Sequence, residues 1–231
     1  MTGWLGPEEW DAVRLSLRVA IVATLLTLPV AYALAHALAR GRFRGRAALN
    51  IAVHLPLVLP PVVTGYLLLL AFGPTAPMGR ALEAVGLPLA FRWTGAALAA
   101  GIMALPLMVR AIRLALETVD TRLEAAAATL GASPARIFAT VTLPLAAPGV
   151  LAGAVLGFAK AIGEFGATIT FVSNIPGETR TLPTAIYTFL QVPGGDASAL
   201  RLTAVAVAIA ALALVLSEVW AARALKRLRG Q

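Results

Sequence analysis

The stretch AIRLALETVDTRLEAAAATLGASPARIFATVTLPLAAPG, residues 111–149, separates two strongly apolar runs, and its mixed charges make it too polar to cross a lipid bilayer. Residues 114–130 are rich in strong helix formers, and Gly131 supplies the backbone freedom with which helices often end. Ser133, with a proline directly behind it, is typical of a helix start. The stretch therefore predicts a helix over 114–130 and a second one that restarts at Ser133 and stops before Pro144.

The whole chain has the composition of an integral membrane protein. Of its 231 residues, 59% are hydrophobic and 13% are charged, against a charged share of about a quarter in soluble domains. It has no cysteine, which excludes disulfides and thiolate metal ligands, and its two histidines are too far apart in sequence to suggest a metal site. The net charge of +8 lies in short clusters between apolar runs, so it indicates membrane topology rather than nucleic-acid binding.

Five apolar stretches are long enough to cross about 30 Å of hydrocarbon as helices. The predicted fold class is therefore an all-α integral membrane protein with about five transmembrane helices. The spans are expected at residues 19–39, 51–72, 93–109, 150–172 and 202–222. The remaining residues then form an external N-terminal segment (1–18), a cytoplasmic loop (110–144) and a cytoplasmic basic tail (223–231).

Basic residues predict the orientation, because loops rich in arginine and lysine stay in the cytoplasm. Residues 40–46, between the first two spans, carry four arginines, and basic residues recur in the loop over 110–144 and in the tail. The N-terminus is therefore expected outside and the C-terminus inside. Arg14 and Arg18 lie on the outer side before the first span, where three acidic residues within 8–11 are expected to pair with them.

Prolines indicate that the second span is broken. Pro56, Pro60 and Pro61 each remove a backbone donor and disfavour helix at the preceding residue. Broken helices at membrane depth are tolerated where they face protein or a water-lined cavity, so they recur in transport pathways. A proline kink packed against neighbouring helices is the alternative interpretation.

The loop resembles the EAA loop of ABC importer permeases, in which Glu-Ala-Ala precedes a glycine and an aliphatic-x-Leu-Pro sequence follows. Ala126, Gly131, Val141, Leu143 and Pro144 keep this spacing. The resemblance implies a type I ABC importer permease architecture, whose short helix after the glycine docks in a cleft of a separate cytoplasmic ATPase. Small residues for close approach, with one or two larger anchors, suit such a contact. The predicted coupling residues are Glu124, Ala125, Ala126, Gly131, Ala132, Ser133, Pro134, Arg136, Phe138, Leu143 and Pro144.

One position departs from the family pattern. The place of the usual glutamate holds Ala125, and the acid, Glu124, lies one residue earlier. Because a helix turns by about 100° per residue, Glu124 is not expected to point where the family's glutamate points. Gly131 and the helix after it are thus the expected docking element. An ordinary amphipathic helix lying on the membrane surface is the alternative.

Two further strings resemble one branch of this family, the permeases for molybdate and their close relatives that carry sulfate. They are VHLPLVLPPVVTGYLLLLAFG, residues 53–73, and GEFGATITFVSNIPGETRTLPTAIYTFLQVPGG, residues 163–195. The resemblance implies a homodimeric permease subunit of an ATP-driven importer for molybdate or tungstate in the cytoplasmic (inner) membrane. Molybdate, tungstate and sulfate share shape and charge, so a sulfate permease of the same family stays open as an alternative.

The resemblance also implies the partners: ABC ATPase subunits, a periplasmic or extracellular oxyanion-binding protein, a second copy of the chain, and membrane lipid. The binding protein is expected to dock on the outer loops around 73–92 and 173–200, with contacts at Tyr187, Phe189 and Gln191. The chain lacks the Walker A pattern G-x-x-x-x-G-K-[ST]. ATP and Mg²⁺ are therefore expected on the partner ATPase, with no cofactor on this chain and no enzymatic activity of its own.

A charged pair lies within the fourth predicted span. Lys160 and Glu164 are four residues apart and share one helix face, where an ion pair offsets part of the cost of placing charge in lipid. Gly163 and Gly166 beside them permit close packing or a bend. Either this face lines the path of the anion or the dimer seam, with Lys160 attracting the anion and Glu164 positioning it, or the pair fastens the span to its neighbours.

Hydroxyl groups and backbone amides can hold a tetrahedral dianion without a full countercharge, which suits a carrier that must also release its cargo. Candidate donors are Thr64, Tyr66, Thr168, Thr170, Ser173 and Asn174. The predicted pathway residues are Pro60, Pro61, Thr64, Lys160, Gly163, Glu164, Gly166 and Thr168.

Two other classes of protein are alternatives to the permease. A transporter driven by an ion gradient fits the broken span and the charged pair but leaves the loop over 110–144 without a role. An intramembrane enzyme would need a pattern such as H-E-x-x-H, a Ser/His pair or clustered acids, and the predicted spans carry none.

Overall fold

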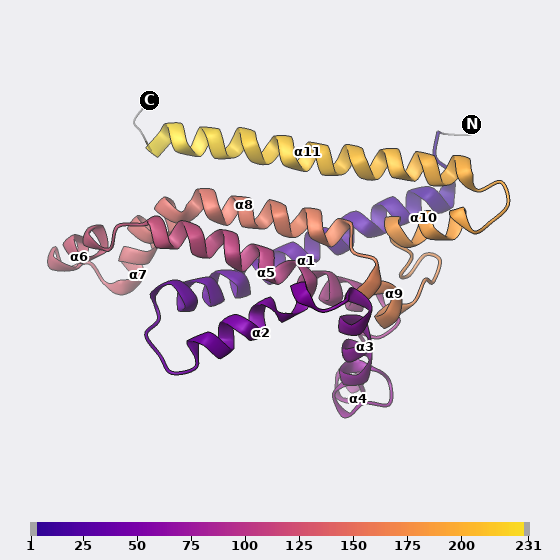
Figure 1. Cartoon of the computed structure of the whole chain (residues 1–231), viewed down its shortest axis with the longest axis horizontal. Coiled ribbons are helices and arrows are strands. Elements are labelled where there is room, and N and C mark those ends of the chain that lie inside the picture. Colours follow the sequence, from indigo (N-terminus) through magenta and orange to yellow (C-terminus); the bar gives the residue numbers. More distant parts are fainter. Residues whose placement is uncertain (1–3, 229–231) are drawn as a thin grey trace.

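The computed structural model describes residues 4–228, and in that range every regular element is a helix. The long helices are α1 (Pro7–Arg40), α5 (Trp93–Thr118), α8 (Leu143–Ile162) and α11 (Asp196–Leu228). The shorter ones are α2 (Arg46–Val58), α3 (Pro61–Phe72), α4 (Pro77–Ala84), α6 (Thr121–Thr129), α7 (Pro134–Ile137), α9 (Gly166–Val172) and α10 (Leu182–Leu190), with a π-helical turn, η1 (Phe138–Thr142). Figure 1 shows the long helices side by side, with α3 and α4 projecting from one side.

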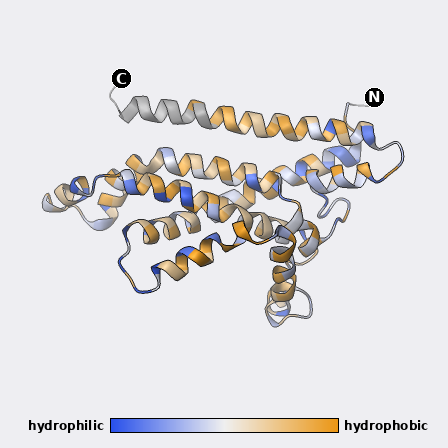
Figure 2. Ribbon diagram, in the orientation of Figure 1, coloured by the Kyte–Doolittle hydropathy of each residue, from blue (hydrophilic) through white to orange (hydrophobic). Residues whose placement is uncertain are grey.

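The prediction of an all-α membrane protein with about five spans is confirmed. Four helices in the described range are long and apolar enough to cross a membrane, and the pair α2 and α3 makes a fifth if it counts as one span. Figure 2 shows apolar residues along the lengths of these helices. The first helix begins at Pro7, earlier than the predicted residue 19, because Ala12, Val13 and Ser16 are buried and hold the extra turns against the bundle.

The second span is broken where its sequence predicts. α2 ends at Val58, α3 begins at Pro61, and the two helices differ in direction by 113°. Pro60 is the N-cap of α3 and Pro61 its first residue, where a missing backbone donor costs no helical hydrogen bond. The carbonyl of Pro60 accepts from the backbone N–H of Val63 at 2.9 Å, so α3 starts cleanly after the bend.

The fourth predicted span, residues 150–172, is divided at Gly163 and Gly166, the glycines that permit a bend. α8 ends at Ile162, and α9 starts at Gly166 after a three-residue break. The cause is Glu164, whose Oε1 accepts from the backbone N–H of Ala167 at 3.0 Å. A carboxylate at the start of a helix satisfies a free backbone donor there, so Glu164 begins a new helix instead of continuing the old one.

The helices of the loop also differ from those predicted. One helix was expected over 114–130, but α5 ends at Thr118 and α6 begins after Asp120, whose side chain accepts from the N–H of Arg122 at 2.9 Å. The second helix was expected to stop before Pro144, yet α7, η1 and α8 follow one another without a gap. The π-helical turn explains this continuity, because it shifts the hydrogen-bond register directly before the proline, which has no N–H to place.

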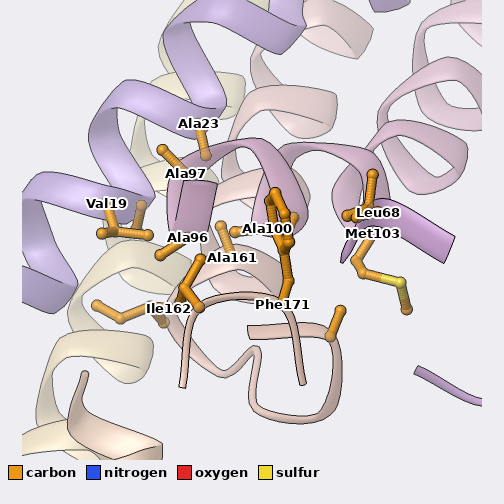
Figure 3. Close-up of a cluster of buried hydrophobic side chains, with 14 residues drawn as sticks. Val19, Ala23, Leu68, Ala96, Ala97, Ala100, Met103, Ala161, Ile162 and Phe171 are labelled. Atoms are coloured by element: carbon orange, nitrogen blue, oxygen red, sulfur yellow. The ribbon is translucent and has the colours of Figure 1, made fainter. Parts of the chain in front are cut away.

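Small residues let the long helices of the core pack closely. Figure 3 shows small side chains of α1 and α5 against Ala161 of α8 and Phe171 of α9. Along α8, Gly153 and Gly157 face α5: a methyl group built on Gly153 would lie 3.2 Å from the carbonyl oxygen of Met108, and one on Gly157 would lie 2.5 Å from the Met108 sulfur. Such close backbone approach is how helices associate where lipid supplies no hydrophobic drive.

The basic loops gather at one end of the bundle. In Figure 1 the connection over 41–45, the pair α6 and α7, and the C-terminal end of α11 all lie at the same end, with the N-terminus at the other. This arrangement agrees with the predicted N-outside, C-inside orientation, and we refer to the two ends as inner and outer. Within the predicted basic tail, 223–231, residues 229–231 lie outside the described residues.

Candidate functional site

The segment between α5 and α8 projects from the inner end and leaves apolar side chains uncovered. Leu130 is 88% exposed, Leu123 50% and Phe138 38%. Gly131 reverses the chain between α6 and α7 at a φ of +82°, with open space around it. The Ser133 hydroxyl accepts from the backbone N–H of Arg136 at 3.4 Å and caps α7, as its sequence predicts. The segment therefore leaves apolar surface open, most of all at Leu130, while Phe138 is partly covered by the ring of Tyr32 on α1.

The predicted coupling residues divide into an outward and an inward set. Ala125, Ala126, Gly131, Ser133, Pro134, Arg136, Phe138 and Pro144 are exposed, whereas Ala132 and Leu143 are half-buried. Glu124 belongs to the inward set: its Oε1 accepts from the Thr142 hydroxyl at 2.7 Å and lies 3.8 Å from Nη2 of Arg40. The acid displaced by one residue therefore points into the protein, while the two alanines after it point out.

The charged pair of the fourth span lies at the break between α8 and α9. Nζ of Lys160 donates to Oε2 of Glu164 at 2.7 Å, and the other carboxylate oxygen caps α9 through Ala167. The Glu164 side chain is only 2% exposed, whereas that of Lys160 is 29% exposed. The carboxylate is therefore fixed by two partners, and the ammonium group is the accessible member of the pair.

The broken second span packs against this break. Gly65 of α3 lies so close to α9 that a methyl group built on it would be 2.9 Å from Cβ of Thr170, and one on Gly166 would be 2.8 Å from Cβ of Pro61. Thr64 and Thr168 are buried on these two helices, and the Thr64 hydroxyl has no hydrogen-bond partner. The fold therefore packs α3, with Pro60, Pro61 and Thr64, against α9, with Gly166 and Thr168. Lys160, Gly163 and Glu164 lie at the break that directly precedes α9.

The other predicted anion donors are engaged in local structure or lie at the surface. The Thr170 hydroxyl donates to the Gly166 carbonyl at 2.8 Å, and Asn174 joins the Thr188 hydroxyl to the Arg180 guanidinium. Tyr66 is 54% exposed on α3. Of the predicted binding-protein contacts, Tyr187 packs its ring 5.2 Å from that of Phe165, Phe189 is half-buried and Gln191 is exposed.

The pairing predicted for the outer arginines is wrong. Arg14 lies over the ring of Trp10, and Arg18 lies 3.7 Å from the ring centre of Trp93. The nearby acids have partners far along the chain, because Glu8 pairs with Arg180 and Glu9 with Arg201. Aromatic faces attract cations, so the arginines are stabilised without an acid. The sequence gives no signal for these two ion pairs, because the partners are separated by 172 positions in one pair and by 192 in the other.

A bundle of long apolar helices with a broken span at its side and an uncovered pair of short helices at its inner end defines a membrane-spanning transport subunit. The chain belongs to the family described as "Binding-protein-dependent transport system inner membrane component", whose model matches residues 19–230. The protein is therefore an inner-membrane component of a transport system.

Two relatives are similar over nearly their whole length. The "Molybdenum transport system permease protein ModB" of Escherichia coli strain K12 is 54% identical over 220 residues, which cover 95% of this chain and 96% of the relative. The protein of the same name from Haemophilus influenzae is 52% identical over 224 residues, or 96% and 97% of the two chains. "Sulfate permease 2, chloroplastic" of Chlamydomonas reinhardtii is 38% identical over 160 residues, 69% of this chain and 42% of the relative.

A solved structure shares the fold. It is that of a bacterial ABC transporter involved in the import of the acidic polysaccharide alginate, with a TM-score of 0.71 over 94% of this chain and 80% of the other. At 19% identity, this likeness shows the fold alone. The architecture predicted from the EAA-like loop, that of an ABC importer permease, is thereby confirmed.

Proposed function

We propose that this chain is the permease subunit of an ATP-driven importer that carries molybdate, or tungstate, across the cytoplasmic membrane. It works as a homodimer with two ATPase subunits and an oxyanion-binding protein on the outer side. The chain contributes the path of the anion through the membrane and the contact through which the ATPase moves the membrane helices. ATP and Mg²⁺ are held by the ATPase, and this chain binds no cofactor.

The exposed surface of α6 and α7 is the observation that supports the proposal of a partner ATPase. Leu130 and Phe138 expose apolar surface around the turn at Gly131, and the alanines and Ser133 leave room for close approach. A short helix with small residues and one or two apolar anchors is the kind of element that seats in a cleft of a partner. An ion-gradient-driven transporter, the second candidate, fits the Lys160 and Glu164 pair within a span but gives the surface of α6 and α7 no partner.

The path is proposed to run beside the break between α8 and α9. Lys160, the exposed member of its pair, attracts the dianion, and Glu164 positions the dianion through its bond to the Lys160 ammonium group. The unpartnered Thr64 hydroxyl on α3 supplies a neutral donor near that point. Charges inside a membrane usually mark a substrate path or a pairing site, and here one side chain in the pair stays accessible.

Molybdate is favoured over sulfate by the extent of the similarity. The relatives named for molybdenum transport are 52% and 54% identical over at least 95% of this chain, whereas the sulfate permease is 38% identical over 69% of it. Selectivity among oxyanions is proposed to reside in the binding protein, which docks on the outer loops around 73–92 and 173–200.

The docking proposal is tested by co-purification of the ATPase with the chain. Changing both Leu130 and Phe138 to serine removes the apolar anchors without altering charge, and we expect at least a tenfold loss of bound ATPase. Leu114→Ser is the matched control, because Leu114 is 66% exposed but lies on α5 outside the docking element. Full retention of the ATPase by the double variant would refute this surface as the docking site.

The substrate is tested by competition. Uptake of labelled molybdate is measured in the assembled transporter with an excess of unlabelled molybdate, tungstate or sulfate. We expect molybdate and tungstate to compete and sulfate to leave uptake unchanged. Equal competition by sulfate would make the chain a general oxyanion permease.

A further inference from the structure

Three side chains from three elements meet at the base of the segment between α5 and α8. Arg40 is the last residue of α1, Glu124 lies in the first turn of α6, and Thr142 ends the π-helical turn η1. One oxygen, Oε1 of Glu124, accepts from the Thr142 hydroxyl at 2.7 Å and lies 3.8 Å from Nη2 of Arg40. We call Arg40, Glu124 and Thr142 the clasp.

Arg40 also forms a hydrogen bond to the chain between α5 and α6. The last carbonyls of a helix have no partner inside it, and Nη2 of Arg40 donates to the carbonyl of Val119 at 2.9 Å. Val119 is buried, where an unpaired carbonyl would be unfavourable. The guanidinium at the end of α1 therefore reaches both the end of α5 and the start of α6.

Thr142 uses its hydroxyl differently from its neighbours. Thr140 donates to the carbonyl of Arg136 at 2.6 Å, and Thr129 donates to that of Ala126 at 2.7 Å, each within its own turn of chain. Thr142 instead donates to a residue 18 positions earlier and is only 3% exposed. The hydroxyl therefore holds two elements together, which a threonine bonded to its own helix does not do.

The same face of α1 contacts the docking element itself. Tyr32 is two turns before Arg40, so the two side chains share one face of the helix. The Tyr32 ring lies 5.5 Å from that of Phe138, nearly perpendicular at 83°. One stripe of α1 therefore touches the segment between α5 and α8 at two points, the clasp and the aromatic pair.

We propose that Arg40 is a positioning residue through which a movement of the docked α7 is transmitted to α1. This inference rests on the proposed function. The chain already offers a direct route, because α7, η1 and α8 are continuous. The clasp adds a second route, so that the first and fourth spans move together. The Arg40–Glu124 ion pair, about a quarter exposed, contributes little to stability. Its loss, unlike loss of the Arg40 bond to the buried Val119 carbonyl, is therefore expected to appear in coupling rather than in folding.

The test uses the complete transporter in proteoliposomes, with molybdate uptake and ATP hydrolysis measured side by side. Thr142→Val keeps the shape of the side chain but removes its donor, and Arg40→Gln removes the charge. We expect both variants to keep their ATPase and to hydrolyse ATP while molybdate carried per ATP falls about fivefold. Thr140→Val is the matched control and is expected to behave as the unchanged protein, because the Thr140 hydroxyl bonds only to the turn directly before it, at the Arg136 carbonyl.

A double variant shows whether Arg40 and Glu124 act through one shared contact or whether each substitution impairs transport by itself. Arg40→Gln combined with Glu124→Gln is expected to lower the uptake per ATP no further than either single change, since both remove one link. A parallel fall of uptake and hydrolysis, an unchanged ratio, or an equal effect of Thr140→Val would overturn the inference. Absence of ATP-dependent uptake in the unchanged protein would instead refute the proposed function.

A distance measurement tests the clasp independently of transport. The chain has no cysteine, so spin labels can be placed at Ala33→Cys on α1 and Ala128→Cys on α6, both exposed positions. We expect the distribution of distances between the two labels to stay narrow when the ATPase binds ATP. In Thr142→Val we expect the same distribution to broaden. Equally broad distributions with and without the Thr142 hydroxyl would show that the clasp does not hold α6 to α1.

Discussion

Arg201, near the start of α11, donates from Nε and Nη2 to a single oxygen of Glu9, in the first turn of α1, at 3.2 and 2.7 Å. Glu9 is 3% exposed, and its other carboxylate oxygen accepts from the backbone N–H of Gly6. The pair joins residues that are 192 positions apart. It fastens the outer ends of the first and last spans to each other.

Arg201→Met is expected to destabilise the protein strongly, because it leaves a buried carboxylate without its countercharge. Breaking a buried pair from one side costs about 3–5 kcal/mol. The measurement is the melting temperature in detergent. Arg92→Met is the control, since the Arg92 side chain is 57% exposed and lies 3.6 Å from Glu178, and an exposed pair is worth about 0–1 kcal/mol. Equal shifts in the two variants would contradict this account of the outer end.

Gly153→Leu is expected to disrupt the packing of α8 on α5. A methyl group at Gly153 would already lie 3.1 Å from Cγ1 of Ile112, so a longer side chain must push the helices apart. Overpacking of this kind costs about 1–3 kcal/mol. Thermal stability and the yield of inserted protein are the measurements. Ala159→Leu, at an exposed position of the same helix, should be neutral, and an equal loss there would argue against a specific α5–α8 contact.

Gly131→Ala is expected to weaken the hold of the ATPase by about 5–30-fold, because a left-handed backbone costs a non-glycine residue about 1–2 kcal/mol. Open space surrounds Gly131, so the effect is one of backbone conformation rather than of collision. Gly45→Ala is the control: Gly45 has a φ of +94° and equally open surroundings but lies between α1 and α2. Titration of the ATPase onto both variants is the measurement, and loss of affinity in both would refute a specific role for Gly131.

The combined change Lys160→Gln and Glu164→Gln decides whether the pair is functional or structural. Glutamine at 164 can still accept from the N–H of Ala167, and no unpaired charge remains in the membrane. We expect normal insertion with at least a tenfold loss of molybdate uptake, because the accessible cation is gone. Lys160→Arg keeps the charge and should retain much of the uptake. Unimpaired transport by the double variant would show that the pair has only a structural role, holding the helices together.

Much of the fold follows from local sequence, because spans, breaks and caps depend on nearby residues. Hydropathy predicted the number of spans, Pro60 and Pro61 the bend between α2 and α3, and Ser133 the start of α7. Gly163 and Gly166 permit the bend after α8, whereas the capping of α9 by Glu164 was not predicted. A carboxylate before a run of small residues is a capping signal. The close contact of α8 with α5 was not predicted either, although glycines four residues apart, at 149, 153 and 157, are a signal for such packing.

The long-range contacts did not follow from sequence. Arg40 was interpreted as one of four arginines that set the topology, and its partner Val119 is 79 positions away. The direction of Glu124 depends on how η1 places Thr142, and a π-helical turn has no simple sequence pattern. The structure leaves most of the predicted coupling residues exposed around Gly131, and their docking role stays a prediction. The contacts of Arg40, Glu124 and Thr142 behind that surface required the tertiary structure.

The most direct test of an ATP-driven molybdate permease is uptake into proteoliposomes that contain this chain, its ATPase and its binding protein. We predict that molybdate accumulates only when ATP is supplied on the inner side and that ionophores which collapse ion gradients leave the rate unchanged. Accumulation that persists without ATP and stops with an ionophore would contradict this account and make the chain a gradient-driven carrier.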